Sequence, residues 1–165
     1  ALRFGAVLIG IDAYQSNPLQ GCVSDALKMK RLLTEKFKVP EHRIQCLLGS
    51  ANSTPGNSII PSRANIVNAL YNLIDNDEIQ RGDNIIIYYA GHGSSYRCSQ
   101  QCTRKSSCCK AGICPIEAIC PIDCDTRNPS DSRCWIPDIS DRELNALFAQ
   151  ISCTKGHKIT FFADC

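Results

Sequence analysis

Three well-separated runs of apolar residues predict the central strands of the protein. They are "RFGAVLIGI" (Arg3 to Ile11), "NIIIYYA" (residues 84–90) and "HKITFFA" (residues 157–163). Uninterrupted runs of this length, rich in β-branched and aromatic residues and bounded by turns, are typical of strands buried on both faces of a parallel sheet. A fourth, shorter strand is expected from Arg43 to Leu48, after the turn "VPEH". We expect all four to be buried, including the last, "KITFFADC".

Between these strands, apolar residues recur every three or four positions, which predicts helices. Ser62 is a good N-cap for the second helix, and Ser140-x-x-Glu143 is a capping-box signature for the third. The apolar positions of the three helices are Val23, Ala26, Leu27, Leu33 and Phe37; Ile66, Ala69, Leu70, Leu73 and Ile74; and Leu144, Leu147, Phe148 and Ile151. Alternating strands and helices predict an α/β protein, a three-layer α/β/α sandwich with a mostly parallel sheet.

Residues 96–134 break this alternation, because they show no periodicity and are interpreted as a cysteine-rich insertion in one loop. The chain has 12 cysteines, and eight of them lie between Cys98 and Cys134. The rest of the chain has an apolar core that needs no disulfide framework. The segment has Cys-x3-Cys twice but neither Cys-x2-Cys nor histidine, so zinc is only weakly indicated. Its redox state and metal content stay open.

The length and net charge of the chain limit the kinds of partner that we expect. A chain of 165 residues is expected to form one domain, residues 1–165, with a sizeable core. The net charge of +2 provides no argument for a nucleic-acid partner or an anionic membrane surface. No apolar run approaches the roughly 20 residues that a bilayer requires, and no targeting segment is visible. We therefore expect a cytoplasmic protein with neither nucleic-acid nor membrane partners.

Candidate chemistry lies at the carboxyl ends of the predicted strands, where parallel α/β sheets place their ligands. Asp12 follows the first strand, His92 lies in "GHGS" after the third, and "DC" closes the last. The glycines beside His92 let the backbone approach a ligand closely, and a thiol near an imidazole can ionise to the thiolate nucleophile of cysteine peptidases. A lone histidine is more often a structural or solvated residue, although the flanking glycines make a functional role more plausible for His92. Taken alone, the last two residues are better explained as a turn acid beside a small buried side chain.

Several motifs in this order resemble the caspase–metacaspase family of cysteine peptidases, close to the fungal caspase-like domains. They are "AVLIGI", "LQGCVSDA", "YYAGHGS", "CPID" and "IPDISDREL". The resemblance implies a caspase-like fold and a cysteine endopeptidase with a Cys–His dyad. As in metacaspases, its substrates would be polypeptides cleaved after Arg or Lys. A role in programmed cell death or stress-linked proteolysis would follow.

The resemblance also implies residue roles. His92 would be the general base and acid, and the Gly93 N–H would donate in the oxyanion hole. Cys22, Asp25 and Asp164 would line the pocket for the Arg or Lys side chain, since two converging carboxylates suit a guanidinium. Asp25 is equally well explained as a first-turn acid favoured by the helix dipole. Ala90 departs from the pattern, because several metacaspases have a polar pocket residue there.

The nucleophile depends on the register of the last residues. In the family it lies in Asp-Ser-Cys-His-Ser-Gly or Asp-Cys-Cys-His-Ser-Gly. In one register, Asp164 matches the Asp of this motif and Cys165 matches the residue after it. The nucleophile would then be the residue that follows Cys165. On this interpretation the chain is a large-subunit part, incomplete at its C-terminus and inactive alone. In the alternative register Cys165 is the nucleophile, which puts Ala163 where the family has Asp.

Neither a cofactor nor a metal site is assigned. Some metacaspases bind calcium through acids that match Asp123 and Asp141, but Arg142 replaces a further acid and should weaken such a site. Calcium activation stays open, although Asp141 and Glu143 also suit a helix N-terminus.

Two other function classes compete with the peptidase. A caspase-fold adaptor or pseudo-enzyme would act through protein contacts, and the residue at the nucleophile position decides between the two. A doubly wound nucleotide-binding domain is disfavoured, because neither G-x-G-x-x-G nor G-x-x-x-x-G-K-[ST] follows the first strand.

Overall fold

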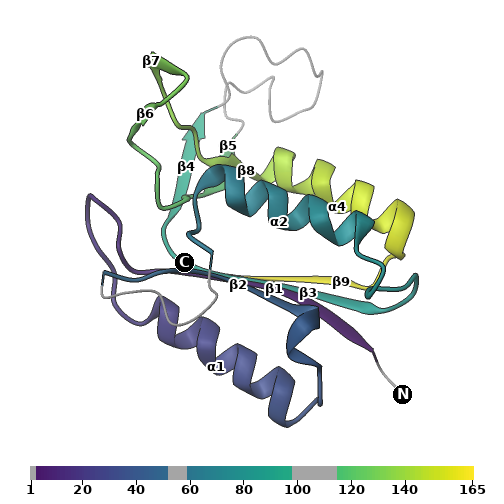
Figure 1. The fold of residues 1–165 in the computed structure, drawn as a ribbon. Helices are drawn as coiled ribbons and strands as arrows, with labels where there is room; N and C mark the ends of the chain where they lie inside the picture. Colours follow the sequence, from purple (N-terminus) through teal and green to yellow (C-terminus); the bar gives the residue numbers. More distant parts are fainter. Residues whose placement is uncertain (1–2, 52–58, 98–114) are drawn as a thin grey trace.

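A four-stranded parallel sheet forms the centre of the protein in a computed structural model that describes residues 3–51, 59–97 and 115–165 (Figure 1). The strands lie in the order β2-β1-β3-β9. Their bounds are β1 (Phe4–Ile11), β2 (Ile44–Gly49), β3 (Asn84–Ala90) and β9 (Ile159–Asp164). Helix α1 (Cys22–Glu35) covers one face, and α2 (Arg63–Asp75) and α4 (Asp141–Lys155) cover the other. The predicted three-layer α/β/α sandwich is confirmed.

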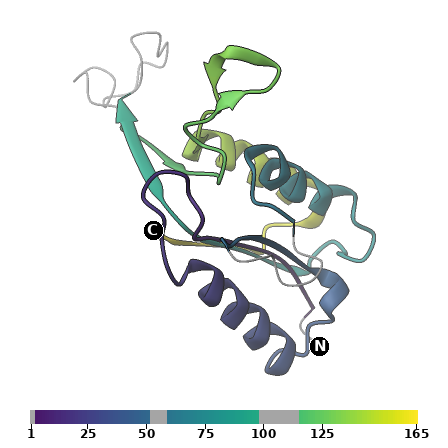
Figure 2. The same ribbon diagram turned by 60° about the vertical axis from the view of Figure 1, so that its left-hand side comes forward.

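The parallel register brings the carboxyl ends of the strands to one edge of the sheet. Gly10 of β1 pairs with Ala90 of β3, and Ala90 pairs with Asp164 of β9. The segments that follow these three strands therefore start side by side. The N-terminus lies at the opposite end of the sheet from the C-terminus, as Figures 1 and 2 show.

Two apolar clusters hold the layers together. The larger lies between the sheet and α2 and α4, and the smaller lies under α1. In α1, the predicted face is buried at Val23, Ala26 and Leu33. Leu27 and the following Phe37 are instead 36% and 49% exposed. Helix α1 ends at Glu35, before Phe37, and the Phe37 ring packs edge-on against that of Phe4, at 5.4 Å between centroids.

Strand β9 is not fully buried, contrary to the prediction from its apolar run. It lies at the edge of the sheet as described, with β3 as its neighbour. Phe162 is consequently 44% exposed, whereas Phe161 on the opposite face packs against Phe148 of α4. Sequence alone cannot distinguish a central from an edge strand when both faces are apolar.

A smaller antiparallel sheet follows β3. Strand β4 (Gly93–Arg97) leaves the main sheet and pairs with β5 (Pro115–Ile119), which pairs with β8 (Ile139–Ser140) (Figure 2). A hairpin of β6 (Arg127–Asn128) and β7 (Asp131–Trp135) projects beyond it. The interpreted insertion at 96–134 lies partly outside the described residues. Its described part contains β5, β6 and β7, which the missing periodicity did not predict.

The helices begin at the predicted caps. Ser62 accepts a hydrogen bond from the Asn65 N–H at 3.3 Å, and Ser140 accepts one from the Glu143 N–H at 3.2 Å. The Glu143 carboxylate does not complete the capping box, because it binds the Arg63 guanidinium at 2.7 Å and so links α4 to α2. Among the described residues, no helix has both the length and the apolar character that crossing a bilayer requires.

A buried ion pair lies at the amino ends of the strands. Arg43, in the 3-10 turn η1 (Glu41–Arg43) before β2, donates to Asp83 just before β3, and both side chains are buried. Asp83 also accepts the Gln80 N–H at 2.9 Å and lies 3.4 Å from Arg3. Burial alone would raise the pKa of Asp83, but the Gln80 N–H and the two arginines together lower it below its ordinary value.

We expect Asp83→Asn to lower the free energy of unfolding at neutral pH by about 3 kcal/mol, because the buried Arg43 charge loses its partner. A lowered pKa means that Asp83 stabilises the fold fully above the ordinary value of about 3.9 and loses this effect as the pH falls through the folded-state value. The difference between wild type and variant should therefore shrink in acid. Urea denaturation of the full-length protein across this pH range measures it.

The control is the double variant Arg43→Met with Asp83→Leu, which removes both charges and should be less destabilised than Asp83→Asn. Equal stability of wild type and Asp83→Asn at neutral pH would show that the pair does not stabilise the fold.

Candidate active site

The segments "GHGS" and "ADC" lie side by side at the carboxyl edge of the main sheet. His92 follows β3, and Gly93 begins β4 where the chain leaves the sheet. Asp164 ends β9 opposite Ala90, and Cys165 follows it. A Cβ atom built on Gly93 would lie 3.2 Å from the Cys165 sulfur. The fold thus brings together the predicted base, the predicted oxyanion donor and the predicted nucleophile region, and a side chain at position 93 would crowd them.

The His92 ring is oriented by a backbone carbonyl. Its Nε2 lies 2.6 Å from the carbonyl oxygen of Asn17. Since a carbonyl only accepts, Nε2 carries the proton, and a neutral ring then has its lone pair at Nδ1. Asn17 has a left-handed backbone with φ of 53°, which Asn tolerates better than most residues. The Tyr14 ring packs against the imidazole at 4.6 Å between centroids.

The backbone of His92 is held by a buried pair of tyrosine hydroxyls. The hydroxyl oxygens of Tyr14 and Tyr89 are 3.0 Å apart. Tyr14 accepts from the His92 N–H at 2.9 Å, and Tyr89 donates to the His92 carbonyl at 2.6 Å. Both hydroxyls also lie 2.9 Å from the carbonyl oxygen of Cys120. Burial raises the pKa of both tyrosines, so the pair stays neutral.

The two tyrosine hydroxyls occupy the space that a side chain at position 91 would fill. A Cβ atom at this position would lie 2.5 Å from the Tyr14 hydroxyl oxygen and 2.7 Å from that of Tyr89. Both distances are far shorter than van der Waals contact. The first glycine of "GHG" is therefore required by the packing behind His92.

The three predicted pocket residues all influence the ionisation of Tyr88. The Tyr88 hydroxyl donates to the Asp164 carboxylate at 3.2 Å. Burial, followed by the charges of Asp164 and Asp25 and by Cys22, raises the pKa of Tyr88 to about 12. Burial, with Asp12 next and Asp164 after it, raises the pKa of Cys22 to about 11. Cys22 is therefore a neutral thiol at neutral pH in surroundings that favour a cation.

Asp25 is available to a cation. Its carboxylate pairs with Lys28 at 2.8 Å, and both side chains are exposed. The amino end of α1 has another partner, because the Cys22 N–H donates to the Asp12 carboxylate at 2.9 Å. Both interpretations of Asp25 stay open, because its carboxylate lies in the first turn of α1 and its charge also raises the pKa of Tyr88.

The acids that match a calcium site are engaged at helix starts. Asp123 accepts the Arg63 N–H of α2 at 2.8 Å, and Asp141 accepts the Arg142 N–H of α4 at 2.7 Å. Asp123 thus binds the first N–H of α2, and Asp141 lies in the first turn of α4, where the helix dipole favours a carboxylate. Calcium activation stays a prediction.

The profile of the metacaspase, peptidase C14 domain matches residues 5–165. The chain belongs to the metacaspase family. Among curated relatives, it is 36% identical to Metacaspase-1 of Arabidopsis thaliana over 96 residues, 58% of this chain and 25% of that protein. It is 32% identical to Metacaspase-9 of the same plant over 90 residues, 54% of this chain and 26% of that protein. For Metacaspase-1B of Aspergillus oryzae the identity is 33% over 92 residues, 55% of this chain and 21% of that protein.

The matched region therefore spans about a quarter of these metacaspases. The fold also resembles the crystal structure of a Geobacter sulfurreducens protein, with a TM-score of 0.60, 17% sequence identity, and coverage of 96% of this chain and 48% of that one. At this identity the likeness concerns the fold alone.

Sequence reasoning found the metacaspase motifs but missed their supports. Asn17, Tyr14 and Tyr89 orient His92, and Tyr88 donates to Asp164. The available signals were the polar turn "DAYQSNP" after the first strand and the paired tyrosines in "YYAGHGS". Neither signal predicts which tyrosine hydroxyl binds which backbone group, because the hydrogen-bonded residues come from different segments of the chain.

Gly91→Ala should lower the free energy of unfolding by about 1–3 kcal/mol, because the added methyl group overlaps the tyrosine hydroxyls. In a Tyr14→Phe background the same substitution should cost less, since the nearer oxygen is gone. A double-mutant cycle on the full-length protein, measured by urea denaturation, detects this non-additivity. Ser95→Ala on the exposed part of β4 is the neutral control. Strictly additive losses would contradict the packing described.

Proposed function

We propose that this metacaspase domain is the large-subunit part of a cysteine endopeptidase that cleaves polypeptides after Arg or Lys through a Cys–His dyad. The observation that carries the proposal is the parallel pairing of β3 with β9, which places His92 and Gly93 beside Asp164 and Cys165. Family membership supports the same chemistry. A role in programmed cell death or stress-linked proteolysis rests on the family resemblance.

In the proposed reaction His92 moves the protons. Its Nδ1 accepts the thiol proton while Nε2 stays bound to the Asn17 carbonyl. The thiolate attacks the scissile carbonyl carbon, and the Gly93 N–H helps to stabilise the resulting oxyanion. His92 then protonates the departing amine, leaving an acyl-enzyme. Water, deprotonated by the same imidazole, hydrolyses the thioester and regenerates the thiol.

The family register makes the residue after Cys165 in the full-length protein the nucleophile. Asp164 then lies two residues before it, with its carboxylate on Tyr88 and away from the dyad. This arrangement leaves Asp164 free to bind the substrate side chain. In the alternative register Cys165 itself is the nucleophile, and its sulfur already lies beside Gly93.

The acids that act on Tyr88 support the proposed preference for basic side chains. Asp25 and Asp164 contribute negative charge, and the high pKa of Cys22 keeps its thiol neutral. An Arg or Lys side chain would replace the Lys28 ammonium at Asp25 and gain the second carboxylate at Asp164. Charge-assisted hydrogen bonds of this kind are among the strongest in proteins.

We expect His92→Ala in the full-length protein to lower kcat/KM on Arg or Lys substrates by about 100- to 10,000-fold, the usual contribution of a general base. Cleavage of peptides with a chromogenic leaving group after Arg measures it. His157→Ala, at an exposed histidine after α4, is the matched control and should retain activity. Wild-type activity in His92→Ala would refute the assigned base.

Cys165→Ser separates the two registers in the same assay. Substantial activity is expected if the next residue is the nucleophile, whereas complete loss with an intact fold would assign that role to Cys165. If the wild-type full-length protein cleaves no Arg or Lys substrate, the adaptor or pseudo-enzyme interpretation is favoured instead.

Asp164→Asn should weaken recognition of basic substrates while the dyad stays intact. The loss of one charge-assisted contact corresponds to about a 10-fold or greater rise in KM for Arg substrates, with a smaller change in kcat. Asp77→Asn, at an exposed acid between α2 and β3, is the matched control. An unchanged KM in Asp164→Asn would remove this residue from the pocket.

A further inference from the structure

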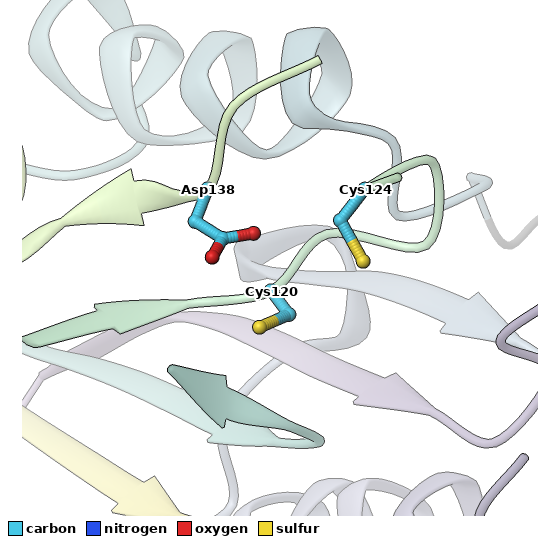
Figure 3. A group of neighbouring side chains, drawn as sticks. All are labelled: Cys120, Cys124 and Asp138. Atoms are coloured by element: carbon cyan, nitrogen blue, oxygen red, sulfur yellow. The ribbon is translucent and has the colours of Figure 1, made fainter. Parts of the chain in front are cut away.

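Two thiols and a carboxylate meet in the smaller sheet, behind the segment that carries His92. They belong to Cys120, Cys124 and Asp138, and their sulfur and oxygen atoms all lie within 4.8 Å of one another (Figure 3). Cys120 is buried, and the other two side chains are partly buried. None of the three has a role in the proposed peptidase chemistry.

The topology explains why residues so far apart in sequence meet. Ile119 of β5 pairs with Ile139 of β8 in antiparallel register. Cys120 therefore leaves β5 at the point where Asp138 enters β8. A turn closed by the Cys124 N–H and the Pro121 carbonyl, at 3.0 Å, brings the second thiol back to the first. The cluster is thus built by strand pairing and a tight turn.

The electrostatics of the cluster favour a cation. The two thiols and the Asp138 carboxylate converge on one point, and a further acid, Asp125, directly follows Cys124 in the chain. Ionising either thiol places a new negative charge beside existing acids. A bound divalent cation makes this ionisation favourable, because a thiol that coordinates a metal loses its proton.

The donor set selects the class of metal. Two sulfurs and one carboxylate oxygen suit zinc, whereas calcium and magnesium require oxygen ligands throughout. With zinc–sulfur bonds of about 2.3 Å, tetrahedral geometry separates two sulfurs by roughly 3.8 Å. The cluster needs a shift of about an ångström at most to reach this. Ser94 donates to the Asp138 carboxylate, the kind of outer contact that orients metal ligands.

We propose that Cys120, Cys124 and Asp138 bind a zinc ion, with the fourth position available to water. Binding two thiolates releases two thiol protons, and the charge of the ion is balanced by the sulfurs. The site goes beyond the proposed peptidase function and does not depend on it. It adjoins that function through the backbone of Cys120, whose N–H donates to the His92 carbonyl at 3.0 Å.

The experiment titrates Co²⁺ into the reduced full-length protein and follows thiolate-to-metal charge-transfer absorbance, then displaces it with Zn²⁺ to obtain the zinc affinity. We expect Cys124→Ser and Asp138→Asn each to weaken zinc binding by about 100-fold or more, and Ser94→Ala by about 10-fold. Proton release, measured calorimetrically in buffers of different ionisation heat, should fall in Cys124→Ser and stay unchanged in Ser94→Ala.

The other cysteines supply the controls. Cys153→Ser on α4 is a matched exposed-thiol control and should bind zinc like the wild type. A variant with Cys98, Cys102, Cys108, Cys109 and Cys114 all changed to Ser should do the same. Zinc binding that survives the double variant Cys120→Ser with Cys124→Ser, or that disappears with those five cysteines, would overturn the proposal. So would recovery of Cys120 and Cys124 only as a disulfide, detected by mass spectrometry under reducing conditions.

Discussion

The hydroxyl pair of Tyr14 and Tyr89 is the contact on which the geometry of the site depends. It joins the loop after β1, the end of β3 and the carbonyl that follows β5, so one buried point connects the main sheet with the smaller one. It also engages both the N–H and the carbonyl of His92. Buried polar groups stabilise a unique arrangement only when all their partners are present. This requirement explains why Gly91 leaves no side chain in the way.

The two ends of the strands differ in their charged groups. The buried Arg43–Asp83 pair lies at the amino ends of the strands, where it links η1 to β3. Acidic groups gather at the carboxyl ends instead, around Tyr88 on one side and around Cys120 on the other. The negative edge matches the proposed recognition of basic side chains, and the second acidic group provides the proposed zinc ligands. The parallel register of the main sheet brings the first group together, whereas the antiparallel pairing of β5 with β8 produces the second.

The local sequence predicted the local structure well. Apolar runs located β1, β3 and β9, and Ser62 and Ser140 cap α2 and α4 as their sequence context indicates. The motifs also singled out His92, Gly93 and Asp164, which the fold brings to the same edge of the main sheet. The short strands β5, β6 and β7 were missed, because elements of two to five residues carry too little periodicity to detect.

The sequence alone determined the order of strands and helices, their caps and the family motifs, since these depend on neighbouring residues. Tertiary structure alone decided which strand lies at the edge and leaves Phe162 exposed. It also decided that Tyr14 meets Tyr89 and that Cys120 meets Asp138, contacts between segments far apart in the chain. Such pairings depend on the parallel register of the sheet and on the crossing into the second sheet, and no local pattern of side chains specifies either.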